Sequence, residues 1–75
     1  MERYELTLNN EPGALAHVVA LVTGRRWKLG SLHLPACDSD RRLLRIELGG
    51  KPEQVEAQLS KLYDVLAVKR VLDRA

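Results

Sequence analysis

The sequence predicts an α+β fold in which two helices cover one face of a four-stranded antiparallel sheet. Two segments space their apolar residues as helices do, and four segments have the alternation or composition of strands. These segments follow one another in the order strand, helix, strand, strand, helix, strand. The length of 75 residues allows one hydrophobic core, which makes a single small domain the expectation.

The first part of the chain predicts a strand followed by a helix. The apolar residues that alternate along the strand are Tyr4, Leu6 and Leu8. Residues 9–13, with the sequence NNEPG, break this pattern, and the helix is expected to begin at about Pro12 because proline suits the first helical position. The apolar stripe of the helix comprises Leu15, Val18, Val19 and Val22, and Ala14 and Leu21 widen it. Gly24 and the two arginines after it are expected to end the helix.

Residues 27–48 predict a hairpin of two strands. Alternation returns over residues 27–36, and Gly30 is expected to form a bulge that lets Leu29 share a face with the later leucines. The cluster Asp-Ser-Asp at 38–40 predicts the turn of the hairpin. The apolar face of the second strand carries Leu44, Ile46 and Leu48.

A second helix and a fourth strand complete the order. Pro52 is expected at the first helical position, with Glu53 in the first turn. The buried stripe of this helix comprises Val55, Leu59 and Leu62. Residues 65–72 are rich in β-branched side chains, which predicts a strand but leaves its buried face open. The right-handed crossover rule folds this order into a ferredoxin-like arrangement, and one face of the sheet then lacks cover.

Composition excludes several ways of stabilising or placing so short a chain. Cys37 is the only cysteine, so an intrachain disulfide is excluded, and with two histidines at distant positions it makes no metal motif. Self-association is therefore the expected support. A net charge of +2 does not favour nucleic acid or a membrane surface, and no apolar run approaches the ~20 residues of a membrane helix. The charged, alternating start of the chain is unlike a secretory signal, which predicts a cytoplasmic protein.

The residue types that carry out catalysis form no recognisable constellation. The acids expected at turns or on solvated faces, as surface or cap residues, are Glu11, Asp38, Asp40, Glu47 and Asp64. His17 and His33 are expected to be exposed polar side chains, and Cys37 an ordinary residue. RNA-binding versions of the predicted fold stack bases on aromatic residues, whereas this chain has no Phe, two Tyr and one Trp.

The segment from Asn9 to Leu15 is the most informative part of the chain for function. A loop that enters a helix presents free N–H groups and the positive end of the helix dipole, which suits a carboxylate. Gly13 would let a small ligand approach the backbone. The spacing alone favours a simple loop and helix cap.

Longer motifs give the chain a resemblance to a known family. The stretch LNNEPGAL at 8–15 is followed by Val18-Val19 and by Ser31-Leu32, and QLSKLYDV occupies 58–65. Over about residues 4–71 these motifs resemble the ACT domain of the small regulatory subunit of acetolactate synthase (acetohydroxyacid synthase). The resemblance is to the short class, which implies that residues 1–75 form a single ACT domain.

The resemblance implies a regulatory subunit and not an enzyme. Such subunits form a homodimer by joining two sheets edge to edge, bind the large catalytic subunit and raise its activity in branched-chain amino acid biosynthesis. Thiamine diphosphate, Mg and FAD are expected on the catalytic subunit, and no cofactor is expected in this chain. A stand-alone ACT domain that senses an amino acid and regulates another enzyme or regulator is the alternative.

The resemblance also implies a site for valine or another branched-chain amino acid between two protomers. The residues that correspond to the family's loop asparagine and helix start are Asn10, Gly13, Ala14 and Leu15. The second strand of the neighbouring chain would contribute Lys28 and Leu29.

Two positions depart from the family pattern. Valine-sensitive members usually have asparagine where this chain has Lys28, and a lysine would repel the ammonium group of the ligand, so weak or absent valine binding is expected. The family's glycine at the end of the first helix is replaced by Arg26. Either Gly24 takes over the left-handed turn or Arg26 adopts it at a modest cost.

The open sheet face is one candidate surface for docking the catalytic subunit. Basic residues that could contribute to such a patch are Arg41, Arg42, Arg45, Lys69 and Arg70. A solvated face is the simpler interpretation of each of these residues.

Overall fold

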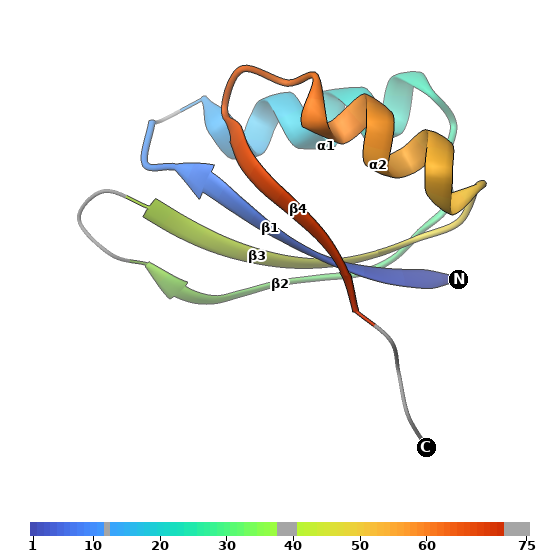
Figure 1. Ribbon diagram of the computed structural model, residues 1–75, viewed down its shortest axis with the longest axis horizontal. Coiled ribbons are helices and arrows are strands. Elements are labelled where there is room, and N and C mark those ends of the chain that lie inside the picture. The colour runs from blue at the N-terminus through green and yellow to red at the C-terminus, as the bar shows by residue number, and fades with distance from the viewer. Residues whose placement is uncertain (12, 38–40, 72–75) are drawn as a thin grey trace.

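A four-stranded antiparallel sheet with strand order β2-β3-β1-β4 carries two helices on one face (Figure 1). We analysed a computed structural model, which describes residues 1–11, 13–37 and 41–71. The elements in chain order are β1 (Glu2–Asn9), α1 (Ala14–Gly24), β2 (Leu29–Cys37), β3 (Arg41–Leu48), α2 (Pro52–Ser60) and β4 (Val65–Val71). The order and the layers confirm the predicted ferredoxin-like fold.

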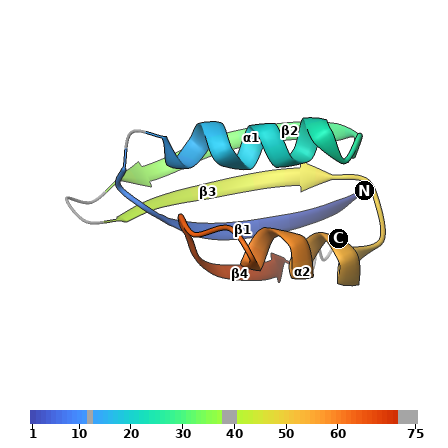
Figure 2. The same cartoon turned by 90° about the horizontal axis from the view of Figure 1, so that it is seen from above.

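The helices divide the sheet between them. Seen from above, α1 lies along the β2 side of the sheet and α2 along the β4 side (Figure 2). The central strands β3 and β1 therefore lie beneath the seam between the two helices, and β2 and β4 form the two edges. The opposite face of the sheet carries no helix in the part of the chain that the structure describes.

The core forms where the alternating strands meet the helices. Tyr4 of β1 lies opposite Ile46 of β3, and Leu6 lies opposite Leu44, which places these side chains on the helix-covered face. The residues that complete the buried cluster are Leu8, Ala14, Val18, Val22, Leu48, Val55, Leu59 and Val65. Period-two alternation therefore correctly predicted the buried faces of β1 and β3.

The start of α1 and the exposure of Val19 differ from the prediction. The helix begins at Ala14 with Gly13 as its N-cap, two residues after the expected start, and Pro12 itself lies outside the described residues. The buried face is formed by Ala14, Val18 and Val22. Val19 is 39% exposed, because it lies about 100° around the helix from Val18, on the side toward the β2 edge.

The bulge expected at Gly30 is confirmed. The pairing of β2 with β3 shifts register between Leu29 and Ser31. Leu29 then lies opposite Leu48 and Leu32 lies opposite Ile46, so both leucines are on the helix side. The two strands pair as the predicted hairpin, and the turn expected at 38–40 lies outside the described residues.

The second helix begins as predicted, with Pro52 at its start and Glu53 in its first turn. It ends at Ser60, so Leu62 packs half-buried against the core from the following turn. The structure also establishes the face of β4 that the sequence left open. Val65 pairs with Leu8 and Val68 with Leu6, which places both valines on the helix side.

Arg26 adopts the left-handed turn after α1, with φ of 59°. The N–H of Trp27 donates to the Val22 carbonyl at 3.2 Å, and the N–H of Arg26 donates to the Thr23 carbonyl at 3.1 Å. These two bonds are the Schellman arrangement, which places its left-handed residue one position beyond the C-cap, here Arg25. Of the two alternatives left open, the one with Arg26 is therefore correct, at a cost of about 1 kcal/mol relative to glycine.

Candidate functional site

The loop between β1 and α1 places four of the predicted ligand residues at one end of the sheet. Asn10 is exposed, and its Oδ1 accepts a hydrogen bond from Nη2 of Arg42 at 3.4 Å. Ala14 is buried, and its N–H donates to the Glu11 carbonyl at 3.1 Å. Leu15 is half-buried and packs against the core. The loop is thus linked to β3 through Asn10 and to the start of α1 through Glu11.

The fold of this chain does not require a glycine at position 13. Its φ of −90° is accessible to any residue. A Cβ added there would lie 3.6 Å from the nearest ring atom of His17, which is an ordinary contact. The glycine leaves the backbone at the start of α1 open, and N–H groups in the first helical turn have no carbonyl partner within the helix.

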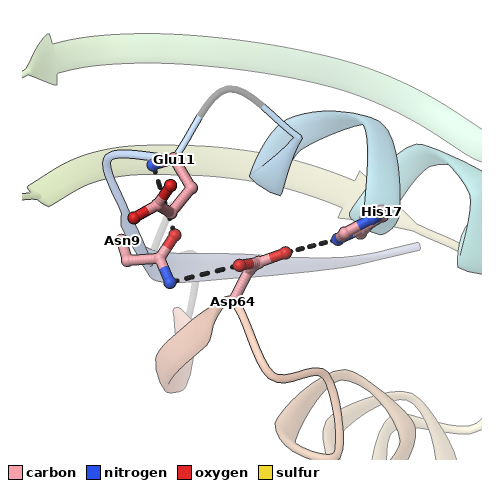
Figure 3. Close-up of polar contacts among 4 residues, drawn as sticks. All are labelled: Asn9, Glu11, His17 and Asp64. Carbon is pink, nitrogen blue, oxygen red and sulfur yellow. Dashed lines mark hydrogen bonds and ion pairs between the residues drawn. The ribbon is translucent and has the colours of Figure 1, made fainter.

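A buried carboxylate joins this loop to the turn before β4 (Figure 3). Oδ1 of Asp64 accepts a hydrogen bond from Nδ2 of Asn9 at 3.1 Å, and Oδ2 contacts Nδ1 of His17 on α1. The backbone N–H of Asn9 donates to the Asp64 carbonyl at 3.0 Å. Asn9 Oδ1 in turn accepts the N–H of Glu11 at 3.3 Å. The four residues form one connected polar network.

This network corrects the interpretation of Asp64 as a solvated turn residue. Asp64 is only 3% exposed, and it is the one buried charged residue among those the structure describes. His17 is exposed as expected, at 62% of its side chain, yet it is paired with Asp64. The partners lie 47 and 55 residues from Asp64, so local spacing carries no signal of the contact. Its position directly before a strand that pairs with β1 is the one available hint.

Within one chain, Lys28 and Leu29 lie at the opposite end of the sheet from the β1–α1 loop. β1 and β2 both run antiparallel to β3, so they point in the same direction. Asn9 pairs with Arg41 at the start of β3, whereas Leu29 pairs with Leu48 at its end. A site that contains all six predicted residues therefore needs a second chain.

An apolar groove runs between α1 and the edge strand β2. It has a volume of about 300 Å³, and it is lined by Val19, Val22, Thr23, Arg26, Trp27, Leu29, Leu32 and Ile46. Val19 is 39% exposed, Leu29 47% and the nearby Leu34 of β2 40%. Large apolar side chains are thus exposed along the β2 edge of the sheet.

The uncovered sheet face carries paired charges. Arg3 and Glu47 approach to 3.5 Å, and Arg45 and Glu5 to 3.3 Å. The cations proposed for a docking patch do not share one face. Strand pairing places Arg41, Arg45 and Lys69 on the open face and Arg42 and Arg70 on the helix side. A single basic patch is therefore not formed, because adjacent residues of a strand point to opposite faces.

The described residues include no group of three or more His, Cys, Asp or Glu side chains that could hold a metal ion. Neither α1 nor α2 is long and apolar enough to cross a membrane.

Known proteins similar to this chain share both its sequence and its fold. The acetolactate synthase isozyme 1 small subunits of two Escherichia coli strains are each 39% identical over 69 residues, covering 88% of this chain and 72% of theirs. No family model matches the chain.

Solved structures agree on the fold. The crystal structure of the ACT domain from the GTP pyrophosphokinase of Chlorobium tepidum superposes with a TM-score of 0.77 and 11% identity, covering 93% of this chain and 95% of that one. A Bacteroides thetaiotaomicron protein superposes with a TM-score of 0.74 and 21% identity, covering 93% of this chain and 46% of that one. The fold is therefore that of an ACT domain.

Proposed function

Because this chain belongs to the family of acetolactate synthase small subunits, we propose that it is a regulatory subunit that binds and activates the catalytic subunit of an acetolactate synthase. The observation that carries the proposal is the 39% identity over 88% of the chain. In this proposal the chain performs no chemistry, and thiamine diphosphate, Mg and FAD belong to the catalytic subunit.

The contacts of three acids have a structural explanation within the fold. Glu5 and Glu47 pair with arginines on the open sheet face, and the buried Asp64 is occupied by Asn9 and His17. Each of these acids thus links two parts of the chain.

The proposal includes a homodimer formed along the edges of the two β2 strands. Antiparallel pairing of two such edges brings the start of one β2 near the end of the other. The end of β2 lies at the same end of the sheet as the loop at Asn10. Lys28 and Leu29 of one chain would then complete the site at the loop of the other chain. The exposed Val19 and Leu29 supply apolar surface for this contact.

The ligand proposed for this composite site is an amino acid with an apolar side chain. Its carboxylate would bind at the start of α1, where N–H groups and the positive end of the helix dipole converge. Asn10 would hold the charged groups of the ligand, and Leu15 together with Leu29 of the second chain would contact its side chain. Ligand binding would regulate the enzyme by favouring one arrangement of the dimer.

Reconstitution tests the regulatory role. The purified chain is mixed with the catalytic subunit from the same organism, and acetolactate formation and co-elution on gel filtration are measured. We expect a complex and a higher rate than the catalytic subunit shows alone, and the chain by itself should form no acetolactate. If the rate is unchanged and the proteins elute separately, the proposal fails. Amino-acid binding without any such complex would favour the stand-alone sensor instead.

Lys28 tests the ligand site. We expect the wild-type chain to bind valine weakly or not at all, because the lysine repels the ligand ammonium. Lys28→Asn should tighten valine binding by about tenfold or more, as expected when a like-charge contact is removed. Isothermal titration calorimetry measures both affinities. Lys61→Asn, an exposed lysine at the end of α2, is the matched control and should change nothing. Micromolar valine binding by the wild-type chain would contradict this expectation.

A further inference from the structure

We propose that Asp64 is a positioning residue for the ligand site, holding the β1–α1 loop in its binding conformation through Asn9 and His17. This inference rests on the proposed ligand-binding role of the loop. The carboxylate in the turn before β4 contacts two segments far from it in the chain, the end of β1 and the first turns of α1 (Figure 3).

The contacts of Asp64 reach both sides of the loop. On one side Asn9 binds Asp64 through Nδ2 and the N–H of Glu11 through Oδ1, so the residues flanking Asn10 are fixed. On the other side, His17 donates its N–H to the Gly13 carbonyl at 3.0 Å, and its ring lies beside Gly13. Both Asn10 and Gly13 are therefore placed by residues that Asp64 holds.

The side chain of Asp64 has a role separate from that of its backbone. The bond from the Asn9 N–H to the Asp64 carbonyl joins β1 to the turn before β4, and any residue at position 64 could accept it. A buried carboxylate is costly unless it is paired, and each oxygen of this one has a partner, at the end of β1 or in α1. Removal of the carboxylate should therefore release the loop without opening the sheet.

Amide hydrogen exchange measured by NMR on the free chain tests this inference without a ligand. We expect Asp64→Asn to reduce protection of the hydrogen-bonded amides of Glu11, Ala14 and His17 by about tenfold relative to the core amides of Leu6 and Leu44, because the contacts of residue 64 with Asn9 and His17 lose their negative charge. Asn9→Ala removes the side-chain link but keeps the backbone bond, and it should give the same pattern. Glu47→Gln, at an ion pair on the open face, is the control and should leave the loop unchanged.

Two further measurements distinguish positioning from general stabilisation. Adding His17→Gln to Asp64→Asn should lower amide protection no further than Asp64→Asn alone, because both substitutions act on the same contact between residues 17 and 64. Calorimetric titration with valine, leucine and isoleucine in the Lys28→Asn background should show weaker binding when Asp64→Asn is added. Loss of protection shared equally by loop and core, or no loss at all, would overturn the inference. If none of the three amino acids binds in that background, the proposed ligand site fails, and the exchange pattern decides whether Asp64 holds the loop.

Discussion

Tyr4 carries a polar atom into the centre of the core. The residue is 1% exposed, and its hydroxyl has no hydrogen-bond partner among the described residues. The ring fills space between the sheet and the helices, whereas the hydroxyl loses its water on folding. An unsatisfied buried hydroxyl costs about 1–3 kcal/mol. The aromatic ring and not the phenol is therefore the useful part of this side chain.

Tyr4→Phe should accordingly stabilise the protein by about 1 kcal/mol in the free energy of unfolding. Urea denaturation followed by circular dichroism measures the change. Tyr63→Phe is the matched control, because Tyr63 is 87% exposed and its hydroxyl remains in water. A loss of stability in Tyr4→Phe would show that the hydroxyl has a partner in solution.

The same hydroxyl predicts a loss of stability at high pH. Burial raises the pKa of Tyr4, and the negative charges of Glu2 and Glu56 raise it further. In the unfolded chain the tyrosine pKa is about 10, so above that pH the unfolded state releases its proton before the folded state does. Stability is therefore fully present below pH 10 and falls as the pH rises toward the raised pKa. The difference in unfolding free energy between wild type and Tyr4→Phe should widen between about pH 9 and pH 11.

At the scale of elements, the connection from β3 to α2 depends on a glycine beside the only tryptophan. Gly50 has φ of +106°, a region that side chains disfavour. A Cβ at Gly50 would lie 2.9 Å from Cδ1 of Trp27, closer than van der Waals contact allows. Trp27 itself is half-buried against the core. The absence of a side chain at Gly50 thus lets the segment before α2 pack closely against Trp27, in the segment that follows α1.

Gly50→Ala should lower the free energy of unfolding by about 2 kcal/mol, combining backbone strain with the clash against Trp27. Fluorescence of the single tryptophan reports the displacement directly, alongside the urea midpoint. Gly24→Ala is the control: Gly24 is the last residue of α1, nothing lies within 4 Å of the added Cβ, and the free energy of unfolding should not fall. An unchanged Trp27 spectrum in Gly50→Ala would contradict the predicted clash.

The face of α1 shows how far local pattern determines an element. Val18 and Val19 both fit the helical stripe, because residues at i+3 and i+4 lie on the same side of a helix. The structure buries Val18 together with Ala14 and Val22 and leaves Val19 at the groove beside β2. The choice depends on where the sheet lies beneath the helix, and the spacing of apolar residues does not contain that information.

At the scale of the molecule, a small core leaves apolar side chains exposed at both sheet edges, Leu66 on β4 and a larger group at β2. Val19 of α1 and Leu29 of β2 line the groove there, and Leu34 is exposed on the same strand. A domain of this size buries only about 60% of the surface of its unfolded chain, so burying further apolar surface in a dimer would add stability. Each edge strand has a helix beside it, α1 at β2 and α2 at β4 (Figure 2), and the described apolar groove lies at the β2 edge.

We expect the wild-type chain to be a dimer at micromolar concentration, measured by size-exclusion chromatography with light scattering. Val19→Lys should convert it to a monomer, because a charge would be buried in the contact between β2 edges. Tyr63→Lys is the control, since Tyr63 is more exposed but lies next to β4, on the far side of the sheet from β2. A monomeric wild-type chain, or loss of the dimer in Tyr63→Lys alone, would contradict the β2-edge dimer.

The sequence by itself determined the order of the elements, the buried faces of β1 and β3, the bulge at Gly30 and the start of α2. Each of these depends on neighbours within a few residues, which alternation and helical spacing record directly. The loop at Asn10 and Gly13 was also evident from its residue types.

Only the tertiary structure decided the buried face of β4, the exposure of Val19 and the burial of Asp64 against Asn9 and His17. These features depend on pairing between segments far apart in the chain, by 47 and 55 residues in the case of Asp64. Such contacts are established by how the helices and strands pack, so an aspartate that looks like an ordinary turn residue in the sequence becomes the buried anchor of the loop.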